Sequence, residues 1–231
     1  MKICGFQKMT MLDFPGKVAC TVFTGGCNFR CPFCHNALLV TDIDESSTFD
    51  EEEIIAYLYK RKGIIDGVCI TGGEPLMQKD IAAFLEKVKE TGMPVKLDTN
   101  GSYPQKLREL VDKKLVDYVA MDIKNSKAKY AETVGLPSYD IAKVEESVDF
   151  LLSDAVDYEF RTTVVKEFHT KEDIEDITHW IKGAKRYFLQ GFVDSGNLIG
   201  SGMSAIKPQE MVEICTKAQE IVPNTVLRGI K

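Results

Sequence analysis

The sequence predicts an α/β fold built on an open, curved parallel sheet. Strand-like apolar runs alternate with amphipathic segments of helical period along almost the whole chain. Strands that alternate with helices imply parallel pairing through right-handed crossovers. We expect about six βα units, a partial version of the eight-fold barrel. A flat, doubly wound sheet is the alternative, because alternation alone does not separate the two.

The periodicity also places the individual elements. A hairpin-like section is expected over residues 1–24, turning near Pro15 and Gly16. Strand-like runs lie at 18–24, 67–71, 95–99, 118–123, 158–165, 187–192 and 225–230. Segments of helical period lie at 50–62, 78–90, 104–113, 144–153, 171–182 and 208–221. Ser47 or Thr48 is the expected N-cap of the first of these helices.

Composition limits the class of protein. A chain of 231 residues fits one domain, 1–231, with the section 1–24 packed on it. The net charge of −6 gives no basic footprint, which counts against a nucleic-acid partner. No segment has the length and apolarity of a membrane span or a signal-peptide core. We therefore expect a cytoplasmic protein, in which seven cysteines suggest metal or redox chemistry before disulfides.

The most specific motif is a loop that carries Cys27, Cys31 and Cys34. A structural metal site normally has four protein ligands, so three thiolates in one loop indicate a centre with a position left open for chemistry. A 4Fe–4S cluster bound in this way keeps one iron without a protein ligand. The alternative is zinc with His35 as the fourth ligand, although adjacent residues rarely reach one tetrahedral centre together.

Polar residues recur where the predicted strands end, and in βα folds ligand chemistry collects at the carboxyl ends of strands. Taken alone, these residues also suit turns, helix caps and surface ion pairs. Arg161 lies within a strand and is expected to face the open interior, because an unpaired charge in a core is costly. His169 is expected to be an exposed loop histidine. The strand-end residues are Gly72, Gly73, Glu74, Asp98, Thr99, Asp122, Lys124, Gln190 and Phe192.

The cysteine loop, with Phe33 before its last cysteine, resembles the signature of radical S-adenosylmethionine (SAM) enzymes. The segments 34–36, 72–75, 98–101 and 122–124 are similar to those of glycyl-radical-enzyme activases. The whole run, including 5–7 and 13–16, is most similar to anaerobic ribonucleoside-triphosphate reductase activating proteins, and is also similar to pyruvate formate-lyase activating enzymes. This resemblance implies that the partial barrel is of the radical SAM type.

The resemblance also implies a reaction. One 4Fe–4S cluster per chain would pass an electron, supplied by a donor such as flavodoxin or ferredoxin, to SAM. Cleavage of SAM would give a 5′-deoxyadenosyl radical that takes hydrogen from a glycine of a partner glycyl-radical enzyme. The alternatives are a radical SAM enzyme on a small molecule, such as a carboxy-deazaguanine synthase, or a zinc- or cluster-bearing interaction domain without enzymatic activity.

The resemblance assigns roles to named residues, with no catalytic group beyond the cluster and SAM. Cys27, Cys31 and Cys34 would bind the cluster, and a monovalent cation beside the SAM carboxylate would lie at Asp98, Thr99 and Asp122. Residues expected to contact SAM are Phe33, His35, Asn36, Gly72, Gly73, Glu74, Asp122, Lys124, Arg161, Gln190 and Phe192.

Two positions depart from the activase pattern. Phe14 stands where many activases have glycine, and we expect its ring to narrow whatever passes there. The run from Gln190 to Phe192 stands where pyruvate formate-lyase activating enzymes have a histidine that contacts SAM. Both departures favour the ribonucleotide-reductase branch.

Overall fold

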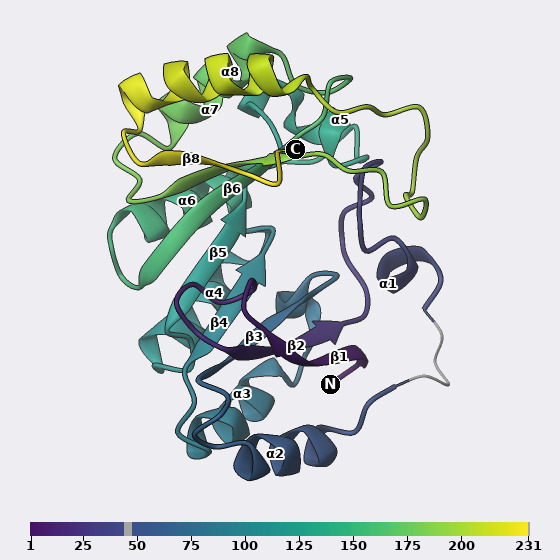
Figure 1. Ribbon diagram of the computed structural model, residues 1–231, viewed down its shortest axis with the longest axis vertical. Helices are drawn as coiled ribbons and strands as arrows, with labels where there is room; N and C mark the ends of the chain where they lie inside the picture. The colour runs from purple at the N-terminus through teal and green to yellow at the C-terminus, as the bar shows by residue number, and fades with distance from the viewer. Residues whose placement is uncertain (44–47, 231) are drawn as a thin grey trace. The chain divides into compact units, whose positions relative to one another are not determined.

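The computed structural model describes residues 1–43 and 48–230, and it has the α/β fold that the sequence predicts (Figure 1). The sheet has eight strands, and their order, β1-β2-β3-β4-β5-β6-β7-β8, follows the chain. A doubly wound sheet reverses direction at a switch point, so this order excludes that alternative. Because β1 and β8 end the order, the sheet is open.

The pairing of the strands is mostly parallel. The hairpin of β1 and β2 is antiparallel, whereas β2–β3, β3–β4, β6–β7 and β7–β8 are parallel. The bounds of β2 to β8 agree with the predicted runs to within a few residues, and β1 lies inside the predicted hairpin-like section. They are β1 Ile3–Thr10, β2 Ala19–Thr24, β3 Gly67–Gly72, β4 Val95–Thr99, β5 Tyr118–Asp122, β6 Asp157–Val164, β7 Tyr187–Gly191 and β8 Thr225–Arg228.

The longer helices coincide with the predicted amphipathic segments, but four short elements were not expected. These span three or four residues each, too few for a helical period to register. The short elements are α1 Leu38–Thr41, η1 Pro75–Met77, η2 Lys127–Lys129 and α5 Tyr130–Thr133. The longer ones are α2 Glu51–Lys60, α3 Ile81–Glu90, α4 Pro104–Asp112, α6 Ala142–Leu152, α7 Lys171–Trp180 and α8 Pro208–Ile221.

The predicted cap of the first long helix was wrong. Asp50 is the N-cap of α2, and its carboxylate accepts a hydrogen bond of 3.1 Å from the backbone N–H of Glu52. Thr48 therefore lies outside the helix, and Ser47 lies outside the described residues. An aspartate is as good a cap as serine, and its charge also favours the positive end of the helix dipole.

The chain divides into two compact units, and the count of one domain stays a prediction. The first unit holds β1 to β4 and α1 to α4, and the second holds α5 to α8 and β6 to β8. Strand β5 begins in the first and ends in the second. The first comprises Met1–Asn28, Leu38–Thr99 and Tyr103–Val119, and the second Phe29–Ala37, Asn100–Ser102 and Ala120–Lys231.

In the first unit, Phe14 is a core residue. Its ring is 4% exposed, and a Cβ added to Gly67 would lie 2.9 Å from it. Gly67 begins β3, whereas Glu74 follows the end of that strand, and a six-residue strand is about 20 Å long. Phe14 thus fills the amino-terminal end of the strands. The expectation that its ring narrows whatever passes there was wrong, because the ring is buried in the core.

In the second unit, large aromatic side chains form much of the core. Tyr158, Phe160 and Tyr187 are almost completely buried on β6 and β7. The Tyr187 hydroxyl donates a hydrogen bond of 2.8 Å to Oγ1 of Thr162, so a buried polar group is satisfied. In the described part of the chain, no helix has the length and apolarity needed to cross a membrane.

Candidate functional site

Some of the predicted site residues belong to the first compact unit and the others belong to the second. The first unit carries Cys27, Gly72, Gly73, Glu74, Asp98 and Thr99. The second unit carries Cys31, Phe33, Cys34, His35, Asn36, Asp122, Lys124, Arg161, Gln190 and Phe192.

In the first unit, the Gly-Gly-Glu segment is held against the loop that leads to Cys27. The backbone N–H of Gly73 donates to the carbonyl of Thr24 at 2.9 Å, and that of Glu74 donates to the carbonyl of Gly26 at 2.8 Å. A Cβ on Gly73 would lie 1.9 Å from the Gly26 oxygen. Glycine is therefore required here for packing inside the protein, whether or not a ligand also approaches.

The Glu74 carboxylate is completely buried and held in one orientation. Its Oε1 accepts hydrogen bonds from Oγ1 of Thr99, at 2.8 Å, and from the backbone N–H of Leu76, at 3.1 Å. Burial raises the pKa of Tyr103, and the charges of Glu74 and Cys27 raise it further. Glu74 and Cys27 therefore both lie within electrostatic reach of Tyr103, a residue that the sequence did not single out.

Asp98 is paired within its own strand. Its Oδ1 accepts a short contact from the ammonium of Lys96, which also lies 3.8 Å from Sγ of Cys69. Residues two apart on a strand share a face, so the pattern in β4 already places Lys96 beside Asp98. The two-residue spacing of this pair was therefore visible in the sequence, although Lys96 was not among the predicted site residues.

In the second unit, a tight turn brings two of the cysteines into one short loop. The backbone N–H of Cys34 donates to the carbonyl of Cys31 at 3.1 Å. The next residue, His35, lies with Nε2 2.8 Å from the carbonyl oxygen of Val193, and its ring stacks on Phe192 with centroids 5.8 Å apart. The segment after β7 thus contacts the end of the cysteine loop.

Three further predicted residues, in the cysteine loop and in β7, also lie in the second unit. Asn36 is half-buried and follows His35, and Gln190 lies in β7 opposite Arg228 of β8. Phe33 is buried, with its ring centroid 5.5 Å from that of Phe168. The aromatic position of the cysteine motif therefore packs into the second unit.

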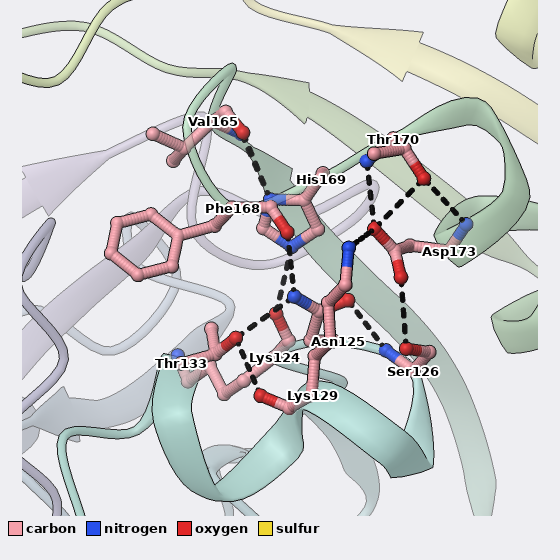
Figure 2. Close-up of polar contacts among 10 residues, drawn as sticks. All are labelled: Lys124, Asn125, Ser126, Lys129, Thr133, Val165, Phe168, His169, Thr170 and Asp173. Atoms are coloured by element: carbon pink, nitrogen blue, oxygen red, sulfur yellow. Dashed lines mark hydrogen bonds and ion pairs between the residues drawn. The ribbon is translucent and has the colours of Figure 1, made fainter.

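The expectation that His169 is exposed was wrong, because its side chain is 3% exposed. Figure 2 shows its ring between the turn after β6 and the backbone after β5. The N–H of Val165 donates to Nδ1 at 3.1 Å, and Nε2 lies 2.8 Å from the Lys124 carbonyl, to which it donates as the neutral tautomer. Burial lowers the pKa of His169, which favours that neutral form. The ring centroid is also 6.2 Å from that of Phe33.

Neighbouring buried polar groups extend this arrangement (Figure 2). The Asn125 amide donates to Oγ1 of Thr133 at 2.8 Å and to the carbonyl of Phe168 at 2.9 Å. Asp173 at the start of α7 accepts from Nζ of Lys129 at 2.6 Å. These bonds fix the backbone that follows Lys124, so that the ammonium of Lys124 projects from a rigid support.

Asp122, Lys124 and Arg161 form a charged group. Oδ1 of Asp122 accepts from Nε of Arg161 at 2.9 Å, and Oδ2 accepts from Nζ of Lys124 at 3.0 Å. Burial alone would raise the pKa of Asp122, but the two cations outweigh it and hold that pKa well below its usual range. Burial would lower the pKa of Lys124, and the charges of Asp122 and Cys31 outweigh it and raise that pKa above its usual range. The ammonium of Lys124 therefore lies within electrostatic reach of Cys31.

Removing the charge of Asp122 is expected to destabilise the protein. In Asp122→Asn, two partly buried cations lose their carboxylate, and we expect a loss of about 2 kcal/mol in the free energy of unfolding, less than for a fully buried pair. Because the pKa of Asp122 is depressed, its contribution is present above the unfolded pKa and is lost as the pH falls through the lower folded value. Urea unfolding at pH 7 should therefore show the full difference, which should shrink only in strong acid.

Glu109→Gln is the matched control for this substitution. It makes the same change of acid to amide in an exposed pair with Lys113, and we expect a much smaller change in the free energy of unfolding than for Asp122→Asn. Equal losses in the two variants would show that the charged group around Asp122 adds nothing to stability.

The donor set fits an iron–sulfur cluster. All seven cysteines are free thiols, and three of them belong to the motif loop. Among the described residues, no three His, Cys, Asp or Glu side chains lie together in a way that could hold a metal ion. Cys27 belongs to the first unit, and Cys31 and Cys34 belong to the second.

Comparison with known proteins gives near full-length relatives as well as partial ones. A candidate glycyl-radical enzyme activating enzyme of Methanocaldococcus jannaschii is 34% identical over 235 residues, which cover 99% of this chain and 96% of that protein. The pyruvate formate-lyase-activating enzyme of Clostridium pasteurianum is 31% identical over 129 residues, 54% of this chain and 52% of that protein. A 7-carboxy-7-deazaguanine synthase of Thermococcus kodakarensis is 39% identical over 83 residues, 36% of this chain and 32% of that protein.

Solved structures share the fold. The crystal structure of Streptococcus suis SuiB bound to the precursor peptide SuiA matches with a TM-score of 0.72 and 14% identity, over 90% of this chain and 48% of SuiB. The chain thus spans about half of SuiB. The family model of the radical SAM superfamily matches residues 21–181, a stretch that begins in β2, ends just after α7 and includes all three cysteines of the motif. The chain belongs to the radical SAM superfamily.

Proposed function

We propose that the protein is an activating enzyme for a glycyl-radical enzyme, and that its substrate is an anaerobic ribonucleoside-triphosphate reductase. The observation that carries the first part is the similarity to the Methanocaldococcus jannaschii relative, which extends over almost the full length of both chains. The similarity to 7-carboxy-7-deazaguanine synthases is shorter and covers between about a third and two thirds of either chain. A core common to radical SAM enzymes suffices to explain the shorter similarity to the deazaguanine synthases. The longer similarity to the Methanocaldococcus jannaschii relative also includes elements outside that core.

The family implies a 4Fe–4S cluster and SAM. The cluster would be held by Cys27, Cys31 and Cys34, and together with SAM it would supply reductive cleavage of SAM and removal of a hydrogen atom from a glycine. The protein's own residues would then bind and orient SAM. The buried Glu74 carboxylate, fixed by Thr99, offers an acceptor for the SAM ammonium. Lys124, supported by Asp122, offers a cation near Cys31 for an anionic group of SAM.

The choice of reductase as the substrate has its own support. The run of motifs is most similar to the reductase activating proteins, and the histidine that pyruvate formate-lyase activating enzymes carry after the sixth barrel strand is replaced here. Phe192 lies in that region and stacks on His35 of the cysteine loop. Pyruvate formate-lyase is the alternative protein substrate, favoured by the similarity to the Clostridium pasteurianum enzyme over about half of the chain.

Formation of a glycyl radical tests the proposal. The reconstituted protein, reduced by flavodoxin or dithionite, is mixed anaerobically with SAM and an anaerobic ribonucleotide reductase. We expect the doublet of a glycyl radical in the electron paramagnetic resonance spectrum, and transfer of deuterium from labelled glycine to 5′-deoxyadenosine. A reductase with alanine at its radical position is the control and should give neither signal.

Parallel mixtures separate the alternatives. A doublet on pyruvate formate-lyase alone would overturn the choice of reductase and keep the activase. Conversion of a small-molecule substrate such as a deazaguanine precursor, with no doublet on any glycyl-radical enzyme tried, would overturn the activase itself.

A further inference from the structure

The ion pair between Lys96 and Asp98 is unusual because of its burial. The side chain of Lys96 is 3% exposed and that of Asp98 is 16% exposed. A buried ammonium is costly unless a carboxylate compensates it, and Asp98 provides that compensation. The ammonium also has Sγ of Cys69, on the adjacent strand β3, as a neighbour at 3.8 Å. The pair is therefore built into β4 of the first unit, with Lys96 near the start of the strand and Asp98 one residue before its end.

The surroundings of Asp98 bear on the cation that the resemblance implies at Asp98, Thr99 and Asp122. Each of these three oxygen-bearing side chains already contacts a group of its own unit. Asp98 contacts Lys96, and the Thr99 hydroxyl donates to Glu74. Asp122 contacts two cations, Lys124 and Arg161.

An alkali ion and an ammonium group fill the same role at a carboxylate. Both carry one positive charge, but a metal ion needs several oxygen lone pairs directed at it, whereas an ammonium donates three hydrogen bonds. At Asp98 the protein provides the ammonium, on a side chain held by the strand itself. No ion has to be captured from solution, and no entropy is lost in capturing it.

We propose that the Lys96 ammonium is a built-in monovalent cation, which takes the place of Na⁺ or K⁺ at Asp98. The protein would then bind SAM equally well with and without alkali ions. The expected effect on SAM affinity rests on the proposed function, because SAM is the ligand beside which the Lys96 ammonium would act. The expected effect of Na⁺ and K⁺ on thermal unfolding of a variant without the Lys96 charge rests on the ion pair alone.

The experiment compares the reconstituted wild type with Lys96→Met, which keeps the length of the side chain and removes its charge. The affinity for SAM and the midpoint of thermal unfolding are measured in choline chloride, NaCl and KCl at equal ionic strength. We expect the wild type to bind SAM within about twofold in all three salts. We expect Lys96→Met to bind SAM about tenfold more weakly in choline chloride and to recover in NaCl or KCl, which corresponds to about 1.4 kcal/mol. Its unfolding midpoint should also rise when the alkali ions replace choline.

Three further variants make the result specific. Lys96→Arg keeps the charge and should stay independent of alkali ions. The double variant Lys96→Met with Asp98→Asn has no carboxylate to hold an ion, so its response to alkali ions should vanish. Lys89→Met is the matched control, because Lys89 pairs with the more exposed Asp117, and it should respond to the salts as the wild type does.

Two results would overturn the proposal. One is a wild type that needs NaCl or KCl for SAM binding, a result that does not depend on how well any variant folds. The other is a Lys96→Met protein whose SAM affinity and unfolding midpoint are the same in all three salts. Neither readout involves a glycyl-radical enzyme, so a failure of activation leaves these outcomes unchanged and separates the two proposals.

Discussion

Replacement of Cys31 with alanine is expected to abolish both iron binding and SAM cleavage. The motif offers three thiolates, and a cluster held by two has lost a third of its protein ligands. The measurements are iron and sulfide content, the brown absorbance of the reconstituted protein, and 5′-deoxyadenosine formed after reduction with dithionite. The wild type should give all of these signals. We expect the activity of Cys31→Ala to fall below detection, and the same for Cys27→Ala and Cys34→Ala.

Cys215→Ala is the matched control for the cysteine substitutions. Cys215 is buried in α8, and burial raises the pKa of its thiol, which makes it a poor ligand at neutral pH. This variant should keep its cluster and cleave SAM at the rate of the wild type. If Cys31→Ala still cleaved SAM, the cysteine loop would not be the site of the chemistry. A colourless wild type with stoichiometric zinc and no iron would instead establish the non-enzymatic alternative.

A second large effect is expected for Gly73→Ala. The added Cβ would lie 1.9 Å from the carbonyl oxygen of Gly26, and the clash is with backbone, which has no rotamer to escape it. The hydrogen bond from Glu74 N–H to that same oxygen must then stretch or break. We expect the free energy of unfolding to fall by at least about 3 kcal/mol, at the upper end of the range for overpacking. Urea unfolding followed by circular dichroism measures it.

Gly63→Ala separates the clash from the general cost of replacing glycine. Gly63 has φ +86° and no atom within 4 Å of an added Cβ, so only the left-handed backbone opposes alanine. That cost is about 1–2 kcal/mol. Gly73 has no positive φ, so its loss should come from contact alone. A loss no larger in Gly73→Ala than in Gly63→Ala would mean that the Gly-Gly-Glu segment is not pressed against the cysteine-loop backbone.

Much of the fold was predictable because apolar periodicity follows directly from burial. The strand β4 and the helix α8 have the predicted starts, since Pro208 suits the first turn of a helix and a short apolar run suits a buried strand. The short elements α1 and α5 were missed, because four residues carry no period. The cap at Asp50 was missed because several residues before α2 are capable of capping, and only the backbone conformation selects one.

The contacts of the site residues depended on more than sequence. His169 was expected to lie in solvent, since a histidine in a loop usually does, but the turn after β6 returns its ring to the Lys124 carbonyl. Phe14 was interpreted by comparison with a family pattern, and the hairpin instead places it in the core. Lys96 was overlooked although its spacing from Asp98 was visible, because the burial of a lysine cannot be read from a period of two.

By itself the sequence determined the kind of chemistry, because three thiolates in one loop define the metal-binding group without reference to any distant residue. It also determined the succession of strands and helices, since each is encoded by a local period. Only the tertiary structure decided that Arg161 meets Asp122 and that the pair of Lys96 with Asp98 is buried. Ion pairs depend on distance and burial, and both are set by which strands become neighbours and how deeply their faces are covered.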